Sequence, residues 1–446
     1  MIKVVKFGGS SLADAKQFQK VAEIIRADDS RVYVVPSAPG KRFDHDIKIT
    51  DLLYECFELA STGKNFYEPF LAVKDRYNEI IQGLGLNFSL KEQFDEIENN
   101  LLNSQEVLNL KDYTASRGEY LNGLVMANYL GYDFIDAASV IFFDESGNFD
   151  ANKTNEILSA ELSKHEHAVI PGFYGSDNNG RIKTFSRGGS DITGSIVAAA
   201  CRAVVYENWT DVSGLLMADP RIVSGPAVMR NITYKELREL SYMGATVMHE
   251  DAIFPVKKVG IPINIRNTNN PEDPGTWIVE NTARRSKYTI TGIAGRKNFC
   301  SIIIAKDLMH SQPDFYRKVV QCFEEKNIPL EHLLSGIDTM TVIVPESKFI
   351  EYEQEILSRI SKLAQPESLE VESGISLIAV VGRSMKSQAG TASKIFTALA
   401  NARINIRMID QGASELNIIV GVLNEDFERA IRSIYHIFVD AGTDEK

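Results

Sequence analysis

The chain has 446 residues, of which 44% are hydrophobic and 24% are charged, and its formal net charge is −12. This length is too great for one ordinary domain, so we expect two or three domains with sizeable cores. The negative charge argues against non-specific binding to nucleic acid or to an anionic membrane surface, although a small anion could still bind in a local basic pocket.

The sequence lacks the marks of secretion, membrane insertion and structural metal binding. Its first residues enter a strand-like run without an apolar leader, and the best apolar stretch, residues 196–206, is short and interrupted by Arg202. The four cysteines contain no CxxC pair, so we expect reduced, mostly buried thiols and no zinc site. These features predict a cytoplasmic protein that binds neither nucleic acid nor membrane.

The first part of the chain reads as alternating strands and helices. Residues 2–7 are predicted to form a buried strand, followed by a glycine turn, a helix that opens at residues 10–11, and a second strand over residues 31–36. This order indicates a parallel sheet covered by helices. Residues 52–130 have a mainly helical pattern, and a further short strand is expected at residues 204–206.

A cluster of Asn, Pro and Gly at residues 267–275 is typical of turns, so we place a catalytic domain before about residue 286 and a second region after it. The second region contains a diverged repeat with a period of about 75–80 residues, and each copy reads β-α-β-β-α-β. The first copy opens at residues 300–305 and the second at residues 377–381. Because each copy is too small for a large core, pairing within and between chains is expected.

The first turn carries the clearest chemistry, in the run KFGGSS at residues 6–11. A strand passes through Gly8 and Gly9 into a helix, so that backbone N–H groups at the helix start can bind an anion. Lys6 adds a positive charge where phosphoryl oxygens would lie. The run is not a Walker A loop, and taken alone it would also fit a tight turn with a surface lysine.

A second glycine-rich turn, SRGGSD at residues 186–191, also opens a predicted helix. Arg187 offers a bidentate fork for a carboxylate or a phosphate. Asp191 could orient cationic groups or simply cap the helix. Two such turns in one chain are much less probable by chance than either alone.

Two further motifs are ambiguous by themselves. Thr210 and Asp211 follow a strand, and Arg221 lies in a nearby turn, so all three suit contacts to a nucleotide or are ordinary loop residues. Glu119, in SRGE at residues 116–119, is placed at a helix start. There it could bind a substrate ammonium group or complement the helix dipole.

As a set, these motifs resemble those of the aspartate kinase family, within the wider amino-acid kinase fold group. KFGGSS, SRGE, SRGGSD and the TDVSG–ADPR pair at residues 210–221 occur in the family's order, as does SYMGA at residues 241–245. The C-terminal repeat resembles the two ACT domains of these kinases. Two departures concern the adenosine side of the nucleotide site, where Leu216 replaces a tyrosine and Thr246 a lysine found in other members.

The resemblance implies an α/β fold. An amino-acid kinase domain with a mainly parallel sheet sandwiched by helices is expected at residues 1–285, followed by two ferredoxin-like βαββαβ ACT domains. The first ACT domain is expected at residues 298–372. It would be inserted in a discontinuous second ACT domain made of residues 286–297 and 373–446.

The same resemblance implies ATP-dependent phosphorylation of the β-carboxylate of aspartate, with Lys6 and Asp191 as catalytic residues. The residues expected to bind ATP are Lys6, Gly8, Gly9, Ser10, Thr210, Asp211 and Arg221. The residues expected to bind aspartate are Ser37, Thr50, Glu119 on its ammonium group and Arg187 on its α-carboxylate. Mg²⁺ would be held by the nucleotide phosphates and water, so no protein metal ligands are expected.

Regulation is expected at the first ACT domain. Lysine, with or without threonine, is the expected feedback inhibitor of the first step in lysine, threonine and methionine biosynthesis. The residues expected to line the effector site are Leu308, Phe315, Tyr316, Glu331, Ser335 and Asp338. Glu331 and Asp338 could meet a ligand's ammonium groups or could be exposed loop charges. A homodimer, or a dimer of dimers, through the ACT domains is expected.

Other interpretations stay open at this stage. A related kinase acting on another acid would explain the glycine turns, but not the doubled ACT-like tail. A catalytically inactive amino-acid sensor is disfavoured because Lys6, Arg187 and Asp191 are all retained. Fusion to homoserine dehydrogenase is not expected, since no dinucleotide-binding segment follows the ACT-like region.

Overall fold

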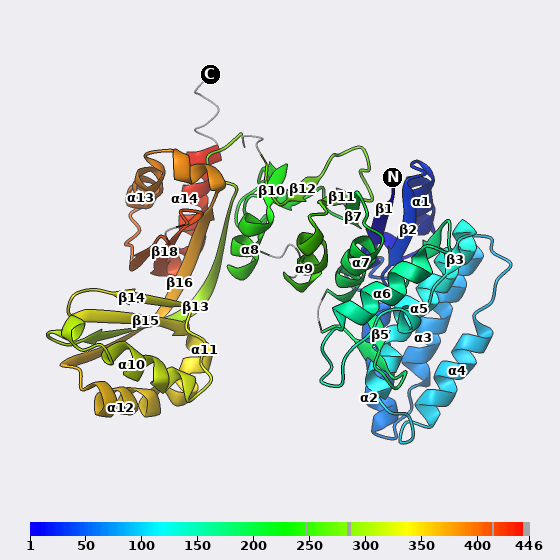
Figure 1. Cartoon of the computed structure of the whole chain (residues 1–446), viewed down its shortest axis with the longest axis horizontal. Coiled ribbons are helices and arrows are strands. Elements are labelled where there is room, and N and C mark those ends of the chain that lie inside the picture. The colour runs from blue at the N-terminus through cyan, green and yellow to red at the C-terminus, as the bar shows by residue number, and fades with distance from the viewer. Residues whose placement is uncertain (187, 246–247, 249, 283–286, 413, 440–446) are drawn as a thin grey trace. The chain divides into compact units, whose positions relative to one another are not determined.

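The computed structural model describes residues 1–186, 188–245, 248, 250–282, 287–412 and 414–439. The chain folds into two compact units, whose elements are labelled in Figure 1. The first unit comprises Met1–Leu215, Val228–Lys235 and Val247–Arg284. The second comprises Leu216–Ala227, Glu236–Thr246 and Arg285–Lys446. Among the described residues, no helix is long and apolar enough to cross a membrane.

The first unit is built on an eight-stranded sheet in the order β10-β12-β11-β7-β1-β2-β4-β3. Neighbouring strands run parallel except β11 and β12, so the predicted, mainly parallel sheet is confirmed. The strands are β1 (Lys3–Phe7), β2 (Arg31–Pro36), β3 (Asp133–Phe134), β4 (Ala168–Val169), β7 (Val205–Thr210), β10 (Asn231–Thr233), β11 (Ile263–Asn267) and β12 (Thr276–Val279). Short pairs outside this sheet are β5 (Tyr174–Ser176) with β6 (Ile182–Thr184), and β8 (Leu215–Leu216) with β9 (Val228–Met229).

Helices cover this sheet, as Figure 1 shows. They are α1 (Ala15–Arg26), α2 (Ile49–Ser61), α3 (Tyr67–Gly83), α4 (Lys91–Leu102), α5 (Leu110–Leu130), α6 (Ala151–Leu162), α7 (Gly189–Ala200) and α9 (Glu250–Val259). The helix α8 (Tyr234–Tyr242) belongs mostly to the second unit. The helix expected to open at residues 10–11 is instead a short 3₁₀ turn, Gly9–Leu12, followed by α1. The Asp14 side chain accepts a hydrogen bond from the Gln17 N–H, and this cap sets the true start of α1.

The second unit is built on a six-stranded antiparallel sheet in the order β14-β15-β13-β16-β18-β17. Its strands are β13 (Gly292–Ala305), β14 (His332–Ser335), β15 (Thr339–Pro345), β16 (Ser368–Val381), β17 (Met408–Asp410) and β18 (Asn417–Leu423). Its helices are α10 (Phe315–Glu324), α11 (Glu346–Phe349), α12 (Glu353–Ala364), α13 (Thr391–Asn401) and α14 (Phe427–Val439). The predicted double β-α-β-β-α-β pattern is present.

The two repeat copies share their longest strands. β13 and β16 pair along almost their whole length, and their register shifts between Arg296 and Ser301. The part of β13 before this irregularity therefore pairs in the copy that contains β18, and the part after it pairs with β15. The expected strand at residues 300–305 is only the second half of a 14-residue strand. Local sequence patterns do not reveal that two repeats use one strand.

Candidate functional site

A cleft of about 710 Å³ opens in the first unit, at the carboxyl ends of β1, β2 and β7. Ligands in open α/β sheets commonly bind at this edge. Eight of the residues predicted to bind ATP or substrate meet here: Gly8, Gly9, Ser10, Ser37, Thr50, Glu119, Thr210 and Asp211. They come from segments more than 200 residues apart in the sequence, which the sheet brings together.

The glycine turn after β1 is tightly packed against its neighbours. The Gly8 N–H donates to the Trp209 carbonyl at 2.9 Å, and the Gly9 carbonyl accepts from the Gly40 N–H at 2.8 Å. A Cβ at Gly9 would lie 2.8 Å from the Ala38 carbonyl oxygen. Glycine is therefore required at position 9 by space alone. Because its N–H is already used, Gly8 serves the site by allowing close approach rather than by offering a free amide.

Lys6 forms a buried ion pair with Asp191. Its Nζ lies 2.6 Å from Asp191 Oδ1, and Lys6 is only 7% exposed. Asn208 Nδ2 donates to the same oxygen at 2.9 Å. Lys6 and Asn208 are direct partners in the register of β1 and β7, so their side chains leave the same face of the sheet. The helix α7 brings Asp191 to that face. The N-cap of α7 is Gly188 and Asp191 lies in the first turn, so the alternative that Asp191 caps the helix is not supported.

Glu119 contributes a buried carboxyl group to the cleft. It is 4% exposed, and Oε1 accepts from Ser190 Oγ at 3.5 Å, whereas Oε2 is buried without a hydrogen-bond partner. Burial raises the pKa of Glu119 to about 8, although hydrogen bonds from the backbone and Ser190 and the charge of Lys6 oppose the rise. A cation placed beside Oε2 would favour the ionised form.

The position of Glu119 corrects one expectation. Glu119 lies in the middle of α5 (Leu110–Leu130) rather than at a helix start, so it cannot complement the dipole of a first turn. The part of α5 from Thr114 to Glu119 is buried on every side, so the sequence around Glu119 lacks an amphipathic pattern that would show its place in the helix.

Ser37, Thr50 and Thr210 stand at the ends of secondary-structure elements. The Ser37 carbonyl, directly after β2, accepts from Asn122 Nδ2 at 2.6 Å. Thr50 is the second residue of α2. The Thr210 carbonyl accepts from the Thr268 N–H at 2.8 Å, which ties β7 to the segment after β11. These bonds hold the backbone and leave the side chains of Ser37 and Thr50 at the cleft.

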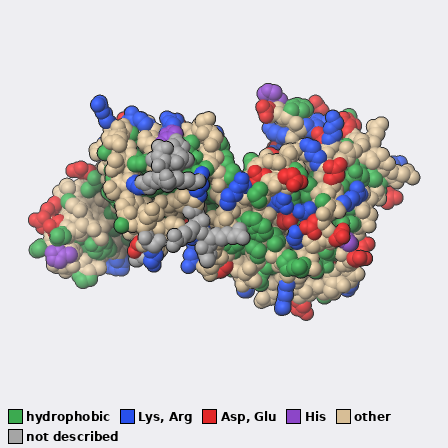
Figure 2. All heavy atoms as spheres, turned by 90° about the horizontal axis from the view of Figure 1, so that it is seen from above, with side chains coloured by type: hydrophobic (Ala, Val, Ile, Leu, Met, Phe, Trp, Pro, Cys, Tyr) green, Lys and Arg blue, Asp and Glu red, His purple; other side chains and the backbone are tan. Residues whose placement is uncertain are grey.

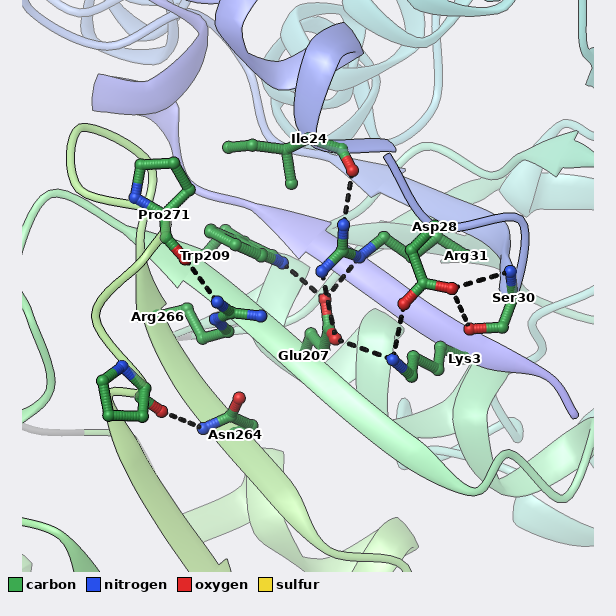
Figure 3. Close-up of polar contacts among 11 residues, drawn as sticks. Lys3, Ile24, Asp28, Ser30, Arg31, Glu207, Trp209, Asn264, Arg266 and Pro271 are labelled. Atoms are coloured by element: carbon green, nitrogen blue, oxygen red, sulfur yellow. Dashed lines mark hydrogen bonds and ion pairs between the residues drawn. The ribbon is translucent and has the colours of Figure 1, made fainter. Parts of the chain in front are cut away.

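Trp209 follows Asn208 in β7, so its side chain leaves the opposite face of the strand. Figure 3 shows Trp209 with Glu207, Arg31 and Arg266. Its Nε1 donates to Glu207 Oε2 at 2.9 Å, and the same oxygen accepts from Arg31 Nε at 2.9 Å. The guanidinium carbons of Arg31 and Arg266 lie 5.3 and 4.5 Å from the Trp209 ring. This buried network fixes the strand end whose carbonyl holds Gly8.

Not every predicted residue joins the cleft. Arg221 belongs to the second unit, where its side chain is 83% exposed and pairs with Asp219 Oδ2 at 2.6 Å. Leu216 is also in that unit, half-buried in β8. Arg187 and Thr246 lie outside the described residues. Lys6 and Asp191 stand beside the cleft rather than among its lining residues, although a Cβ at Gly8 would lie 3.6 Å from Lys6 Nζ.

The structure also adds residues that the motifs did not indicate. Lys41, Arg42, Phe43 and Lys48 line the cleft from the segment between β2 and α2. Their sequence contains lysine and arginine beside aspartate, but no motif distinguishes it from an ordinary charged loop. Asn208 could have been found from the register of β1 and β7, because it lies opposite Lys6.

The residues predicted to bind an effector lie in two groups in the second unit. Leu308 is 64% exposed, and its N–H donates to Asp338 Oδ1 at 3.0 Å. Ser335 is exposed at the end of β14. Phe315 is 1% exposed and packs in the core of the first repeat copy, with the half-buried Tyr316 beside it.

Glu331 forms the other group, and it is not an exposed loop charge. Its side chain is 6% exposed, Oε2 accepts from the Tyr242 hydroxyl at 2.8 Å, and Oε1 lies 3.2 Å from Arg296 Nη1. Tyr242 is the last residue of α8 and belongs to the SYMGA motif. A cationic ligand at Glu331 would therefore compete with Arg296.

Comparisons with known proteins agree with this architecture. The chain matches the model of the amino acid kinase family over residues 1–267 and that of the ACT domain over residues 378–438. It is 37% identical to aspartokinase 3 of Bacillus subtilis over 451 residues, which cover 98% of both chains. The structure resembles Clostridium acetobutylicum aspartate kinase with a TM-score of 0.91 and 52% identity, over 98% of this chain and 100% of the other.

A more distant structural relative is E. coli aspartokinase III, which is 25% identical. The TM-score is 0.76 for its complex with aspartate and ADP, and 0.73 for its complex with lysine and aspartate. Both comparisons cover 98% of this chain and 99% of the other.

Proposed function

The chain belongs to the aspartokinase family, and from that premise we propose that it transfers the γ-phosphoryl group of ATP to the β-carboxylate of L-aspartate, giving 4-phospho-L-aspartate and ADP. The observation that carries the proposal is one cleft in which a glycine turn beside Lys6 meets the buried carboxyl group of Glu119. A cation beside a glycine turn suits a phosphoryl group, and a buried carboxyl group suits a substrate ammonium.

The reaction needs no general base, because an aspartate side chain has a reference pKa of about 3.9 and is ionised at neutral pH. The difficulty is the approach of one anion to another. In this proposal Lys6 stabilises the charge that develops on the transferring phosphoryl group. Asp191, itself held by Asn208, keeps the Lys6 ammonium in place for that task.

The nucleotide binds with its phosphates at the turn of Gly8, Gly9 and Ser10 and extends toward Thr210 and Asp211. Mg²⁺ would be held mainly by nucleotide phosphates and water, and it would supply neutralising charge there. Arg221 remains a proposed ATP contact on the strength of its motif alone.

The amino-acid substrate is placed by its charged groups. Glu119 accepts its ammonium group, and Ser37 and Thr50 offer hydroxyls from the wall of the same cleft. Arg187 clamps the α-carboxylate, an assignment that rests on the SRGGSD motif. E. coli aspartokinase III, which resembles this chain, was solved in complex with aspartate and ADP.

Lysine, alone or together with threonine, is the proposed effector in the second unit. E. coli aspartokinase III was also solved in complex with lysine and aspartate. In this chain Glu331 joins Arg296 on β13 to Tyr242 on α8, so a ligand ammonium that displaces Arg296 would alter the contact with α8. Leu308, Phe315, Tyr316, Ser335 and Asp338 complete the proposed effector site.

The proposal extends to domains, pathway and assembly. We assign the kinase domain to residues 1–285, the first ACT domain to 298–372 and the second to 286–297 with 373–446, a division supported by the register shift in β13 and β16. The enzyme would act in the cytoplasm, at the first step of lysine, threonine and methionine biosynthesis. A homodimer, or a dimer of dimers, would form through the ACT domains, because each repeat copy is too small for a large core of its own.

The test is an ADP-release assay with ATP, Mg²⁺ and either aspartate, glutamate or no acceptor, each with and without lysine. Turnover with aspartate alone, suppressed by lysine, supports both substrate and effector. Turnover with glutamate at an equal rate would assign the site to another acid. If aspartate is turned over at a rate that lysine does not change, lysine is not the effector. The proposed kinase reaction would still stand.

A further inference from the structure

One wall of the cleft is a single irregular loop, residues 37–48, which we call the cleft loop. It connects β2 to α2 and contains neither helix nor strand. Residues 37–44 and Lys48 line the cleft. Lys41, Arg42 and Lys48 give this wall three positive charges, and Phe43 at its rim is 60% exposed. A loop that has no ladder of backbone hydrogen bonds must be held in shape by other contacts.

The cleft loop rests directly on the glycine turn. The Gly40 N–H donates to the Gly9 carbonyl at 2.8 Å, and a Cβ at Gly40 would lie 2.6 Å from the carbonyl carbon of Gly9. The two backbones are thus in close contact. A shift of the loop at Gly40 would change the position of the turn or lose this hydrogen bond.

Arg76 contacts the cleft loop at two positions, Gly40 and Asp46. This residue lies on α3 and is 5% exposed. Its Nη2 lies 2.8 Å from each carboxylate oxygen of Asp46, and its Nη1 donates to the Gly40 carbonyl at 3.0 Å. One guanidinium therefore ties Gly40 to Asp46. Neither Arg76 nor Asp46 lines the cleft.

Asp46 also orders Arg42, which does line the cleft. Its carboxylate accepts from the backbone N–H and Nε of Arg42 at 2.9 Å each, and from Nη2 at 3.1 Å. Burial alone would raise the pKa of Asp46, but the hydrogen bonds from Arg42 and the charges of Arg76 and Arg42 outweigh it and hold the pKa below its usual range. Glu79 faces the outer side of Arg42 at 2.9 Å. We call Arg76 and Asp46 together the anchor of the cleft loop, and its Asp46 carboxylate therefore stays charged at working pH.

We propose that Arg76 is a positioning residue, which holds the cleft loop against the glycine turn and so sets the binding of the acceptor amino acid. This inference rests on the proposed function, because it assigns the loop to the acceptor that Ser37, Thr50 and Glu119 also serve. A guanidinium is needed, because only its fork reaches the Asp46 carboxylate and the Gly40 carbonyl together. Lysine at this position could keep one contact only.

The mobility of the cleft loop can be measured by limited digestion with trypsin. This protease cleaves after lysine and arginine, and the loop contains Lys41, Arg42 and Lys48. Native protein and the Arg76→Gln and Arg76→Lys variants are digested well below their unfolding transitions, and fragments are identified by mass. We expect cleavage in the loop to be about tenfold faster or more in both variants. The matched control is Lys74→Gln, on the same helix as Arg76, which removes the ion pair of Lys74 with Glu98 on α4.

The kinetic arm separates positioning from plain destabilisation. A displaced acceptor site should raise KM for aspartate by about tenfold or more in both variants, with KM for ATP within about threefold of native. Circular dichroism confirms that each variant is folded. A merely structural role would lower the unfolding temperature and leave both KM values unchanged. If Arg76→Gln does not fold, the positioning role is tested with Arg76→Lys alone, because lysine keeps the buried positive charge.

The outcomes are distinguishable. Loop cleavage at the native rate in a folded Arg76 variant overturns the anchor, whatever the reaction is. Faster cleavage with an unchanged KM for aspartate overturns the positioning role. If the native chain does not phosphorylate aspartate, the proposed function fails, while the digestion still decides whether Arg76 holds the loop.

Discussion

The ammonium group of Lys6 lies 2.6 Å from the carboxylate of Asp191, a residue 185 positions further along the chain. The pair is assembled because Lys6 leaves β1 on the same face as Asn208 leaves β7, and α7 delivers Asp191 between them. The carboxylate is the ion-pair partner of a lysine in a largely buried position. A fixed cation beside an anion-binding turn is what transfer of a phosphoryl group to a carboxylate requires.

Replacing Lys6 with alanine is expected to lower kcat by about 100-fold or more and to change KM much less, because the charge acts mainly in the transition state. Steady-state ADP release measures both constants. Lys3→Ala is the control, since Lys3 lies on the same strand but pairs with Asp28 at 2.6 Å on the other side of the sheet. A kcat within a factor of a few of native for Lys6→Ala would exclude the proposed role.

Gly9→Ala is expected to destabilise the protein by about 1–3 kcal/mol, because the new Cβ would meet the backbone of Ala38, which cannot rotate away. Urea unfolding measures the change. Gly8→Ala is the neighbouring control, since a Cβ there makes only ordinary contacts, the nearest at 3.6 Å. Equal stability of the two variants would contradict the close packing described for the turn.

The pH dependence of stability should report on Glu119. Its pKa is about 8 in the folded chain, above the ordinary value of 4.5. The stabilising contribution of this carboxyl group to the free energy of unfolding is therefore complete below about pH 4.5, and it is lost as the pH rises through about 8. The Glu119→Gln variant does not lose stability in this way, because glutamine does not titrate. Urea unfolding from about pH 5 to pH 9 should therefore show the glutamine variant gaining on the native protein as pH rises. Parallel pH profiles would show that the carboxyl group is not protonated when buried.

Substrate binding should release a proton from the same group. An ammonium beside Glu119 favours the ionised carboxylate, so the proton held near neutral pH is expelled. Calorimetry of aspartate binding in buffers with different ionisation enthalpies measures this release, which should disappear in Glu119→Gln if that variant still binds. Heats that do not depend on the buffer would argue that the ammonium binds elsewhere.

Regulation by lysine should depend on Glu331. Glu331→Gln removes the charge that faces Arg296 and a ligand ammonium, so the lysine concentration for half-inhibition should rise by about tenfold or more. Activity without lysine should stay near the native level, because Glu331 is outside the catalytic cleft. Glu351→Gln, an exposed acidic position in the same unit, is the control. An unchanged inhibition curve for Glu331→Gln would remove this residue from the effector site.

The fold and eight of the sixteen residues that line the cleft were predicted, the fold and the glycine turn from local signals and Ser37 and Thr50 from the family resemblance. Buried strands, glycine turns and the repeat pattern each occupy a few consecutive residues, and parallel strands bring their carboxyl ends to one edge. The start of the helix after Gly9 was misplaced because the cap at Asp14 divides it. Glu119 was misplaced because the part of α5 that contains it, Thr114–Glu119, is buried on all sides and has no amphipathic pattern.

Other features depend on contacts that no local pattern encodes. Arg76 and Asp46 are 30 residues apart, and only the packing of α3 against the cleft loop shows that they form one anchor. The shared strands β13 and β16 belong to both repeat copies at once. Arg221 follows the TDVSG motif closely in sequence, yet it folds with the second unit.

The central claim is the reaction itself, and the most direct measurement is the ADP released by purified protein with ATP, Mg²⁺ and aspartate, followed by hydroxylamine trapping of the acyl phosphate. The account predicts ADP and trapped product in equal amounts with aspartate, neither without an acceptor, and loss of both in Lys6→Ala. ADP release that is independent of aspartate, or no trapped acyl phosphate, would contradict it.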